Sequence, residues 1–381
     1  MTAASPAAFQ ARRPRVRRLM LTDFRSYPAL DLAVDAPLVA LVGDNGAGKT
    51  NILEALSLFA PGRGLRRAEL AECARAGGQG GFAIGLTIED ELRRTQLGCG
   101  LDADGARRHR IDGASAGSAR DFADYLRIVW MTPAMDGLFY GPAGERRRFL
   151  DRLTLAVDAD HGARVSAYER ALRNRNRLLE TNADRAWLDA AEREAAELGV
   201  AVAAARLETV SRLAALVAAE RDPDSLFPWA DLAIEGGIET MTAGRSALEA
   251  EDLFRVALAR NRARDAAAGR ATFGPQASDL VVRHGPKGIE ARRCSTGEQK
   301  ALLTGVVLAH ARLVAAMSGV APLALLDEIA AHFDPRRRAA LFDELVRIGC
   351  QAWLTGADAQ AFDDLRGRAL MLRVTPGRVE A

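Results

Sequence analysis

The segment from Gly43 to Thr50 has the residue types and spacing of a phosphate-binding loop. It reads Gly43, Asp44, Asn45, Gly46, Ala47, Gly48, Lys49 and Thr50, which matches G-x-x-x-x-G-K-T. The glycines let backbone N–H groups curl around phosphate oxygens, and the helix that follows adds its partial positive charge. Lys49 would place a compact ammonium between the β- and γ-phosphates, and the Thr50 hydroxyl would ligate Mg²⁺. The loop therefore predicts a nucleotide and magnesium site.

Two acids follow a second apolar run, near the end of the chain. Residues 322–326 read Pro-Leu-Ala-Leu-Leu and precede Asp327 and Glu328. A phosphate-binding loop needs a further carboxylate near Mg²⁺, and the end of a neighbouring buried strand supplies it. We assign Asp327 to the metal and Glu328 to the base that orients the attacking water. The alternative is a pair of surface acids at a strand end.

The segment Ser295-Thr296-Gly297-Glu298-Gln299 precedes a long expected helix that leads into the Asp327 strand. It resembles the signature motif of ABC-type ATPases, in which a helix N-terminus binds the γ-phosphate held by the other subunit. An ordinary helix cap, with Ser or Thr followed by Glu, is the alternative. His332 and Asp334 resemble the D-loop of the same superfamily, although a lone loop histidine is more often simply solvated.

The elements that must position these residues can be read from the apolar pattern. Residues 37–42 form a continuous apolar run that suits a strand buried on both faces, and 51–59 follow with helical spacing. Residues 145–220 are almost free of Gly and Pro and predict a long helix pair that breaks at Asn182. Further strands are expected at 16–21, 30–34, 82–88, 110–112, 128–131 and 350–355, the last as the final core strand, with a further helix at 247–268.

A β-rich start and an α/β end therefore flank a helical middle. The expected fold is α/β, with an ABC-type P-loop ATPase head and an inserted, mainly helical second lobe. We expect the head to combine residues 15–135 and 273–381, the helical lobe to span 136–272, and residues 1–14 to form a disordered tail.

Composition narrows the class of protein. The chain has 381 residues, 27% of them charged, with a formal net charge of +2. The N-terminus lacks the apolar segment of a secretory signal, and no charge-free apolar stretch is long enough to span a membrane. The four cysteines are scattered, which fits a reducing compartment. We therefore expect a cytoplasmic protein without a membrane partner.

Arginine clusters are the candidate DNA contacts, because the near-zero net charge does not by itself indicate a nucleic-acid binder. Arg170, Arg173 and Arg177 share one helical face at i, i+3 and i+7, and Arg63 and Arg66 form a second cluster. A charged surface neutralised by nearby glutamates, such as Glu169 and Glu180, is the alternative.

Taken together these segments resemble the RecF family of bacterial recombination-mediator ATPases, which are related to SMC heads. The resemblance runs along nearly the whole chain, from residues 19–27 over the phosphate-binding loop and residues 62–66 to 142–151, 168–179, the signature and the Asp327 strand. It implies binding of ATP and Mg²⁺, an ATP-dependent homodimer, and slow hydrolysis with Lys49 and Glu328 as catalytic residues. It also adds Arg25 and Asn51 to the nucleotide site.

The same resemblance implies DNA as a partner, in duplex form and at gaps or single-strand junctions. RecF-like proteins act with RecO and RecR at single-strand gaps and help RecA to load there. The expected role is therefore in DNA repair and replication-fork maintenance.

The chain departs from the family pattern at three places. Residues 274–280 read Gly-Pro-Gln-Ala-Ser-Asp-Leu, without the usual His and Arg. Residues 131–133 offer no Q-loop glutamine, and no switch histidine follows Thr355. Two other functions stay open: an ABC transporter ATPase subunit, although 245 residues separate Thr50 from Ser295, and a non-hydrolysing nucleotide-dependent scaffold.

Overall fold

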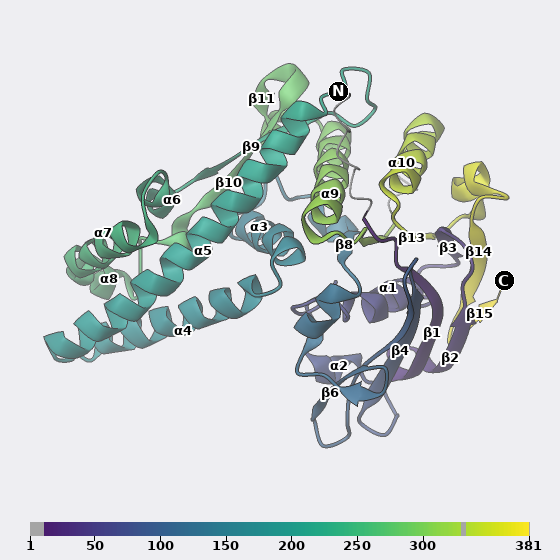
Figure 1. The fold of residues 1–381 in the computed structure, drawn as a ribbon, viewed down its shortest axis with the longest axis horizontal. Coiled ribbons are helices and arrows are strands. Elements are labelled where there is room, and N and C mark those ends of the chain that lie inside the picture. The colour runs from purple at the N-terminus through teal and green to yellow at the C-terminus, as the bar shows by residue number, and fades with distance from the viewer. Residues whose placement is uncertain (1–10, 329–332, 381) are drawn as a thin grey trace, which may run out of the picture. The chain divides into compact units, whose positions relative to one another are not determined.

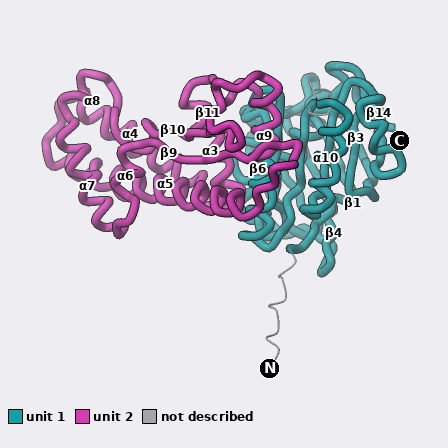
Figure 2. The backbone as a smooth tube through the Cα atoms, turned by 90° about the horizontal axis from the view of Figure 1, so that it is seen from above, with its two compact units in different colours: residues 1–135, 307–381 teal, residues 136–306 magenta. Residues whose placement is uncertain are grey.

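A computed structural model describes residues 11–328 and 333–380 (Figure 1). The chain divides into two compact units, shown in different colours in Figure 2. Unit 1 comprises residues 1–135 and 307–381, and unit 2 comprises residues 136–306. The first boundary lies where the sequence predicts it, and the second falls inside α9 (Thr296–Ser318).

The parallel sheet of unit 1 carries the phosphate-binding loop. Its order is β15-β14-β3-β13-β12-β8, and β3, β13, β12, β8 and β14 run parallel. Alternate residues of β3, such as Val39 and Leu41, enter a core on one side, yet Leu38 and Ala40 are buried too. The sheet is thus covered on both faces, as the continuous apolar runs predict. The strands are β3 (Leu38–Val42), β8 (Ile128–Met131), β12 (Leu323–Leu326), β13 (Ala352–Gly356), β14 (Leu370–Thr375) and β15 (Arg378–Glu380).

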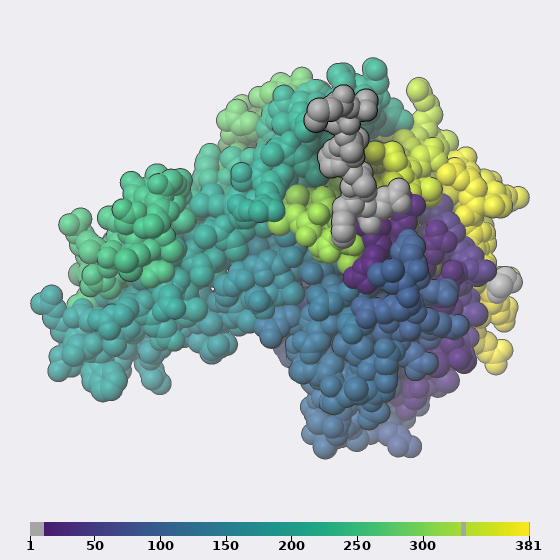
Figure 3. Space-filling view, viewed as in Figure 1, coloured from purple at the N-terminus to yellow at the C-terminus, as the bar shows by residue number. Residues whose placement is uncertain are grey.

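The prediction that residues 350–355 form the last core strand is wrong. β14 follows β13 and pairs in parallel with the other edge of β3, and β15 returns antiparallel to β14. Strand order is set by pairing and not by position in the chain. The apolar and polar residues of β14 alternate over too short a stretch to predict a core strand. In Figure 3 the N-terminal strands, in purple, therefore lie beside the C-terminal segment, in yellow.

A second, antiparallel sheet of unit 1 has the order β2-β1-β4-β5-β6-β7. Its inward residues, among them Leu19 and Ile84, share one core with α1 and with the parallel sheet. Buried and exposed residues alternate along β1, as expected for a strand with one face on the core. The strands are β1 (Arg15–Phe24), β2 (Tyr27–Ala33), β4 (Phe82–Glu89), β5 (Arg94–Leu101), β6 (Arg107–Ile111) and β7 (Ala114–Ser115).

Helices complete unit 1. α1 (Lys49–Ser57) follows the phosphate-binding loop, and α2 (Leu70–Cys73) accepts the Arg25 N–H at its last residue. Short 3₁₀ turns cover Ala119–Asp124, Pro133–Met135 and Ala359–Leu365. In Figure 1, α10 (Pro335–Ile348) and the later part of α9 lie on the opposite side of the parallel sheet from α1. Arg12, within the segment expected as a disordered tail, forms a parallel bridge with Val320, because its backbone bonds Gly319 and Ala321.

Unit 2 is built on helices. The predicted helix pair over residues 145–220 is in fact three helices: α3 (Ala143–Val157), α4 (His161–Glu180) and α5 (Arg185–Ala219). The predicted break at Asn182 is confirmed, since that residue has a φ of 45° between α4 and α5. The predicted helix over 247–268 breaks at Asn261 into α7 (Ala247–Arg260) and α8 (Arg262–Ala268). A short helix, α6 (Gly237–Thr242), lies before them.

Unit 2 also holds a small sheet of order β11-β10-β9, which the sequence does not predict. The strands are β9 (Ala230–Glu235), β10 (Asp279–His284) and β11 (Ile289–Glu290). β10 pairs antiparallel with β9 along its whole length, so residues 273–306 belong with unit 2 and not with the head. The expected boundary at 272 therefore lies at 306, because β10 pairs with β9, a strand of unit 2.

One described helix, α9, is long and apolar enough to cross a membrane by length and composition alone. Its most apolar stretch is 67% buried inside the protein, which is the pattern of a core helix.

Candidate nucleotide site and its neighbourhood

The phosphate-binding loop joins β3 to α1 and needs its glycines. Gly46 and Gly48 have φ values of 84° and 109°, a region that other residues rarely adopt. A Cβ on Gly43 would lie 2.1 Å from the backbone oxygen of Val374, and one on Gly48 would lie 2.8 Å from the Tyr27 hydroxyl. The loop is thus enclosed by β14 on one side and the β1–β2 turn on the other.

Lys49 is the first residue of α1 and is only 4% exposed. Its Nζ donates to the backbone oxygens of Gly43 at 2.6 Å and Asp44 at 2.9 Å. A phosphate in the loop can replace these carbonyls as partners of the ammonium. The planar guanidinium of an arginine does not fit such a compact position.

Thr50, Asp327 and Thr355 form a hydrogen-bonded cluster at the carboxyl ends of the parallel strands. The Thr50 hydroxyl donates to Asp327 Oδ1 and Oδ2 at 2.9 and 3.2 Å, and the Thr355 hydroxyl donates to Asp327 Oδ1 at 2.8 Å. The pairing of Thr50 with Asp327 across 277 residues is what the sequence-based assignment to one metal requires. A hydroxyl and a carboxylate are hard oxygen donors, so these two residues fit Mg²⁺, which takes its other ligands from phosphates and water.

Glu328 follows Asp327 with a φ of 53°, an uncommon conformation for a non-glycine residue. Its backbone N–H donates to the Thr355 hydroxyl at 2.8 Å. One hydroxyl therefore receives the amide of the candidate base and donates to the candidate metal ligand. A residue held in this region by a specific contact is a mark of a functional position.

Sequence reasoning missed Thr355. β13 lies between β3 and β12 in the sheet, so its last residues come out between the phosphate-binding loop and Asp327. A polar residue at the end of an otherwise apolar strand was the available signal.

A buried carboxylate, Glu54, was also missed. Arg25 binds it through two hydrogen bonds of 2.8 and 2.6 Å, and Arg66 adds a third of 2.8 Å. The bond to Glu54 raises the pKa of Arg25 above its usual value despite partial burial. Arg66 also donates to Asn51, and Asn51 donates to Ser26, at 2.7 and 2.8 Å. This network joins the proposed nucleotide contacts Arg25 and Asn51 to the proposed DNA contact Arg66.

The signature segment begins α9 in unit 2. The Ser295 N–H and hydroxyl both donate to Glu298 Oε2, at 2.9 and 3.0 Å, and the Glu298 N–H donates back at 3.4 Å. Lys287 forms an ion pair with the same carboxylate, and this pair with the Ser295 bonds lowers the pKa of Glu298 to about 2. The capping alternative is thus present in the structure. Thr296 and Gly297 are exposed, and Gln299 is buried with its Nε2 bonded to the Cys294 oxygen.

Several further predicted site residues lie on the surface or outside the described residues. His332 lies outside the described residues, and Asp334 caps α10 through the N–H of Arg337 at 3.0 Å. Arg63 forms an exposed ion pair with Glu69 at 3.1 Å. Arg170, Arg173 and Arg177 are all exposed on α4, as the helical spacing predicts.

Residues 274–280, which depart from the family pattern, are held by side chains of unit 2. Arg146 binds both carboxylate oxygens of Asp279, at 2.8 and 2.7 Å, and Arg147 donates to the Ser278 backbone oxygen at 2.8 Å. Tyr168 donates to Gln276 at 2.5 Å. The segment is therefore tied to α3 and α4 within unit 2. Two members of the 146–148 arginine triplet have this bracing role.

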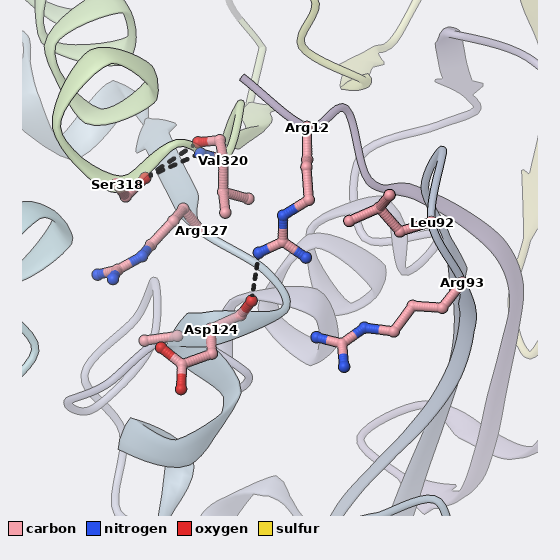
Figure 4. Close-up of a pocket in the computed structure, with 8 residues that line it drawn as sticks. Arg12, Leu92, Arg93, Asp124, Arg127, Ser318 and Val320 are labelled. Carbon is pink, nitrogen blue, oxygen red and sulfur yellow. Dashed lines mark hydrogen bonds between the residues drawn. The ribbon is translucent and has the colours of Figure 1, made fainter. Parts of the chain in front are cut away.

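A hollow of about 450 Å³ lies elsewhere in unit 1 (Figure 4). Arg127 and Val320, which line it, precede β8 and β12, so the hollow is at the amino edge of the parallel sheet. Arg12 crosses it to the Asp124 backbone oxygen at 2.7 Å and to Asp90 at 3.0 Å. It is therefore separate from the nucleotide site, which lies at the carboxyl edge.

Comparison with known proteins places the chain in a family. Residues 15–363 match the family described as the RecF/RecN/SMC N terminal domain. A DNA replication and repair protein RecF of Mesorhizobium japonicum is 53% identical over 369 residues, which cover 96% of this chain and 97% of the relative. The chain belongs to the RecF family. The protein of the same description from Brucella suis is 50% identical over 372 residues and covers 96% of each chain.

Solved structures agree on the fold. The recombination mediator protein RecF-ATPrS in the RecFOR pathway matches with a TM-score of 0.84 at 16% identity, over 98% of this chain and 99% of that one. The RecF-ATP structure of the same pathway gives a TM-score of 0.76 at 19% identity, over 97% and 99%. The expected α/β fold with an ABC-type ATPase head is therefore confirmed.

Proposed function

We propose that this RecF-family protein is a slow, Mg²⁺-dependent ATPase of DNA repair and replication, which dimerises when it binds ATP and then holds DNA. The observation that carries the proposal is the cluster of Thr50, Asp327, Thr355 and Glu328 beside the phosphate-binding loop. A scaffold that only binds nucleotide has no need of a fixed second acid after the metal ligand.

Each residue has a role in this proposal. The loop amides and Lys49 bind the phosphates, and Lys49 neutralises charge between the β- and γ-positions. Thr50 and Asp327 would hold Mg²⁺, which would supply charge neutralisation to the phosphates. Glu328 accepts a proton from the attacking water and orients it toward the γ-phosphate. Thr355 keeps Asp327 and Glu328 in position.

The signature at the start of α9 contributes to the nucleotide of a second copy in this proposal. Ser295 and Gly297 would bind the γ-phosphate, and Glu298 would release Ser295 from its cap when they do so. Because ADP lacks that group, the dimer would require ATP. His332 and Asp334 would then lie in the D-loop at the dimer interface.

The proposed ligand is DNA, in duplex form and at gaps or single-strand junctions. RecO, RecR and RecA are the proposed protein partners in the cytoplasm. The support is the RecF family itself and the DNA replication and repair role that its relatives carry in their names. Arg63, Arg66, Arg170, Arg173 and Arg177 are the proposed phosphate contacts, which would make the affinity fall steeply with salt.

The experiment is phosphate release with and without duplex DNA, for the wild type and for Lys49→Met. We expect turnover that DNA stimulates and that Lys49→Met abolishes together with ATP binding, which calorimetric titration measures. Circular dichroism controls for folding. Nucleotide binding without any turnover would support the scaffold instead, and turnover that DNA leaves unchanged would argue for a transporter-type ATPase.

A further inference from the structure

A basic hollow of about 400 Å³ lies in unit 2 between the first turns of α5, the second half of α7 and the start of α8. These elements lie at the left of unit 2 in Figure 1. Nine residues line the hollow: Arg185, Asp189, Glu192, Arg193, Arg255, Val256, Ala259, Arg260 and Arg262. Five arginines and two acids leave it a formal net charge of +3, more than the +2 of the whole chain.

Arg262 uses both acids of the hollow. Its Nη2 binds Asp189 and Glu192 at 2.5 Å each, and its Nε binds Glu192 at 3.0 Å. Glu192 is 1% exposed and also pairs with the buried Arg175. The carboxylates are thus neutralised by a single arginine on the rim and by another beneath it.

The other four arginines of the hollow have weak ion pairs or none, so their charge is available to a ligand. Arg185 only approaches Asp189, at 3.8 Å, and Arg255 pairs with Asp252 on the surface at 3.3 Å. Arg193 and Arg260 have no ion-pair partner within residues 11–328 and 333–380, and both are exposed. Guanidinium groups that face one hollow and are not neutralised by its acids raise the local concentration of anions.

We propose that this hollow binds the phosphodiester backbone of DNA, as a contact additional to those on α4 and near the phosphate-binding loop. The proposal rests on the DNA binding proposed above. The guanidinium fork matches phosphate oxygens bidentately. The buried Arg175 holds together the helices that carry these forks, because it bonds Glu192 of α5 and the Leu258 backbone oxygen of α7. Only Val256 and Ala259 are apolar in the lining, whereas the core of a protein-binding surface is apolar and aromatic.

The size of the hollow agrees with this ligand. Its volume exceeds that of a single phosphate, so a phosphate can enter with parts of its flanking sugars, and the two apolar residues would contact those sugars. Backbone contacts of this kind position the protein on DNA without reading sequence.

The test compares two double variants with equal charge change. Arg193→Gln with Arg260→Gln removes the unpaired guanidinium groups of the hollow, and Arg94→Gln with Arg283→Gln removes two exposed arginines that belong to no proposed DNA contact. Binding of a mixed-sequence duplex is measured with saturating ATP over a range of salt concentrations. Basal ATP turnover reports that each variant is folded.

We expect the hollow variant to bind DNA roughly 30- to 60-fold more weakly at about 0.1 M salt, because each released counterion contributes about eight-fold, and its salt slope to fall by about 2. The rates at which phenylglyoxal modifies Arg193 and Arg260 in the wild type should fall when DNA is bound, as read by mass spectrometry.

Four results overturn the proposal. Equal losses in the two double variants would indicate a general effect of charge. An unchanged DNA affinity, with lost binding to an acidic protein partner, would make the hollow a protein-binding surface. If the wild type binds no DNA, the proposed function is overturned as well. If the wild type binds DNA and the hollow variant binds it equally well, only the proposed site is overturned.

Discussion

At the scale of single residues, the Thr355 hydroxyl connects the two acids of the candidate site. It donates to Asp327 Oδ1 and accepts the N–H of Glu328, both at 2.8 Å. The second bond stabilises a left-handed backbone at Glu328, which costs about 1 kcal/mol or more in a non-glycine residue. A single hydroxyl thus holds the Asp327 carboxylate and the backbone of Glu328.

Thr355→Val keeps the shape of the side chain and removes the hydroxyl. We expect the rate of ATP hydrolysis to fall about 10- to 100-fold, because a misplaced base loses most of its orientation advantage, while ATP affinity changes less than about two-fold. Steady-state kinetics and calorimetric titration measure the two quantities. Thr355→Ser is the matched control and should recover most of the rate; equal losses in both variants would mean that the methyl group, and not the hydroxyl, matters.

Glu328→Gln removes the proposed base and leaves every phosphate contact. We expect a protein that binds ATP, dimerises and stays on DNA, with hydrolysis slower by roughly 10²–10⁴-fold. Single-turnover kinetics and sedimentation measure rate and assembly. Fast turnover in this variant would assign the proton transfer to another group.

At the scale of elements, α4 shows how one helix separates arginines by face. Arg173 is exposed and lies 4.0 Å from Glu169, whereas Arg175 is fully buried. Arg175 binds Glu192 of α5 at 3.1 Å, Asp265 of α8 at 2.8 Å and the Leu258 oxygen of α7 at 2.7 Å. One guanidinium therefore joins four helices of unit 2.

Arg175→Met should destabilise unit 2, because it leaves a buried carboxylate pair without its shared cation. We expect a loss of about 3 kcal/mol, which lowers the thermal midpoint of a unit of this size by roughly 6 to 12 °C. Arg173→Ala, two residues away, should change stability by less than about 0.5 kcal/mol. Scanning calorimetry measures both, and a similar midpoint for the two variants would contradict the role given to Arg175.

At the scale of the whole molecule, the proposed assembly uses two different parts of the chain. Lys49 belongs to unit 1 and Ser295 to unit 2. In the proposed dimer, the γ-phosphate would be held by Lys49 of one copy and by Ser295 and Gly297 of the other. Dimerisation and hydrolysis then depend on both motifs, whereas ATP binding by one copy depends on the loop alone.

Ser295→Arg should therefore bind ATP as a monomer but fail to dimerise or hydrolyse. Mixed with Lys49→Met, it forms a heterodimer in which one composite site has both lesions and the other has neither. We expect the mixture to recover up to about half of the wild-type sites, measured as phosphate release, while each variant alone stays inactive. An ATP-dependent dimer of Ser295→Arg alone, seen by ultracentrifugation, would decide against the shared site.

The sequence by itself determined the parts of the site that are local. Each of these parts is contiguous, because a loop that wraps phosphate or starts a helix is built from neighbouring residues. They are Gly43 to Thr50, the pair Asp327 and Glu328, and the Ser295 segment. The break at Asn182 was predictable because asparagine accepts the left-handed backbone that follows a helix end. The RecF-family fold followed from these segments in order.

Only the tertiary structure decided which distant residues meet. Thr355 enters the site because β13 pairs between β3 and β12, and β10 joins β9 in unit 2 and not the head sheet. Glu54 and Arg175 are of residue types that usually lie on the surface, but both are buried among partners from other elements. Strand order and burial depend on contacts between residues far apart in the chain. A local sequence pattern does not reveal the free energy of those contacts.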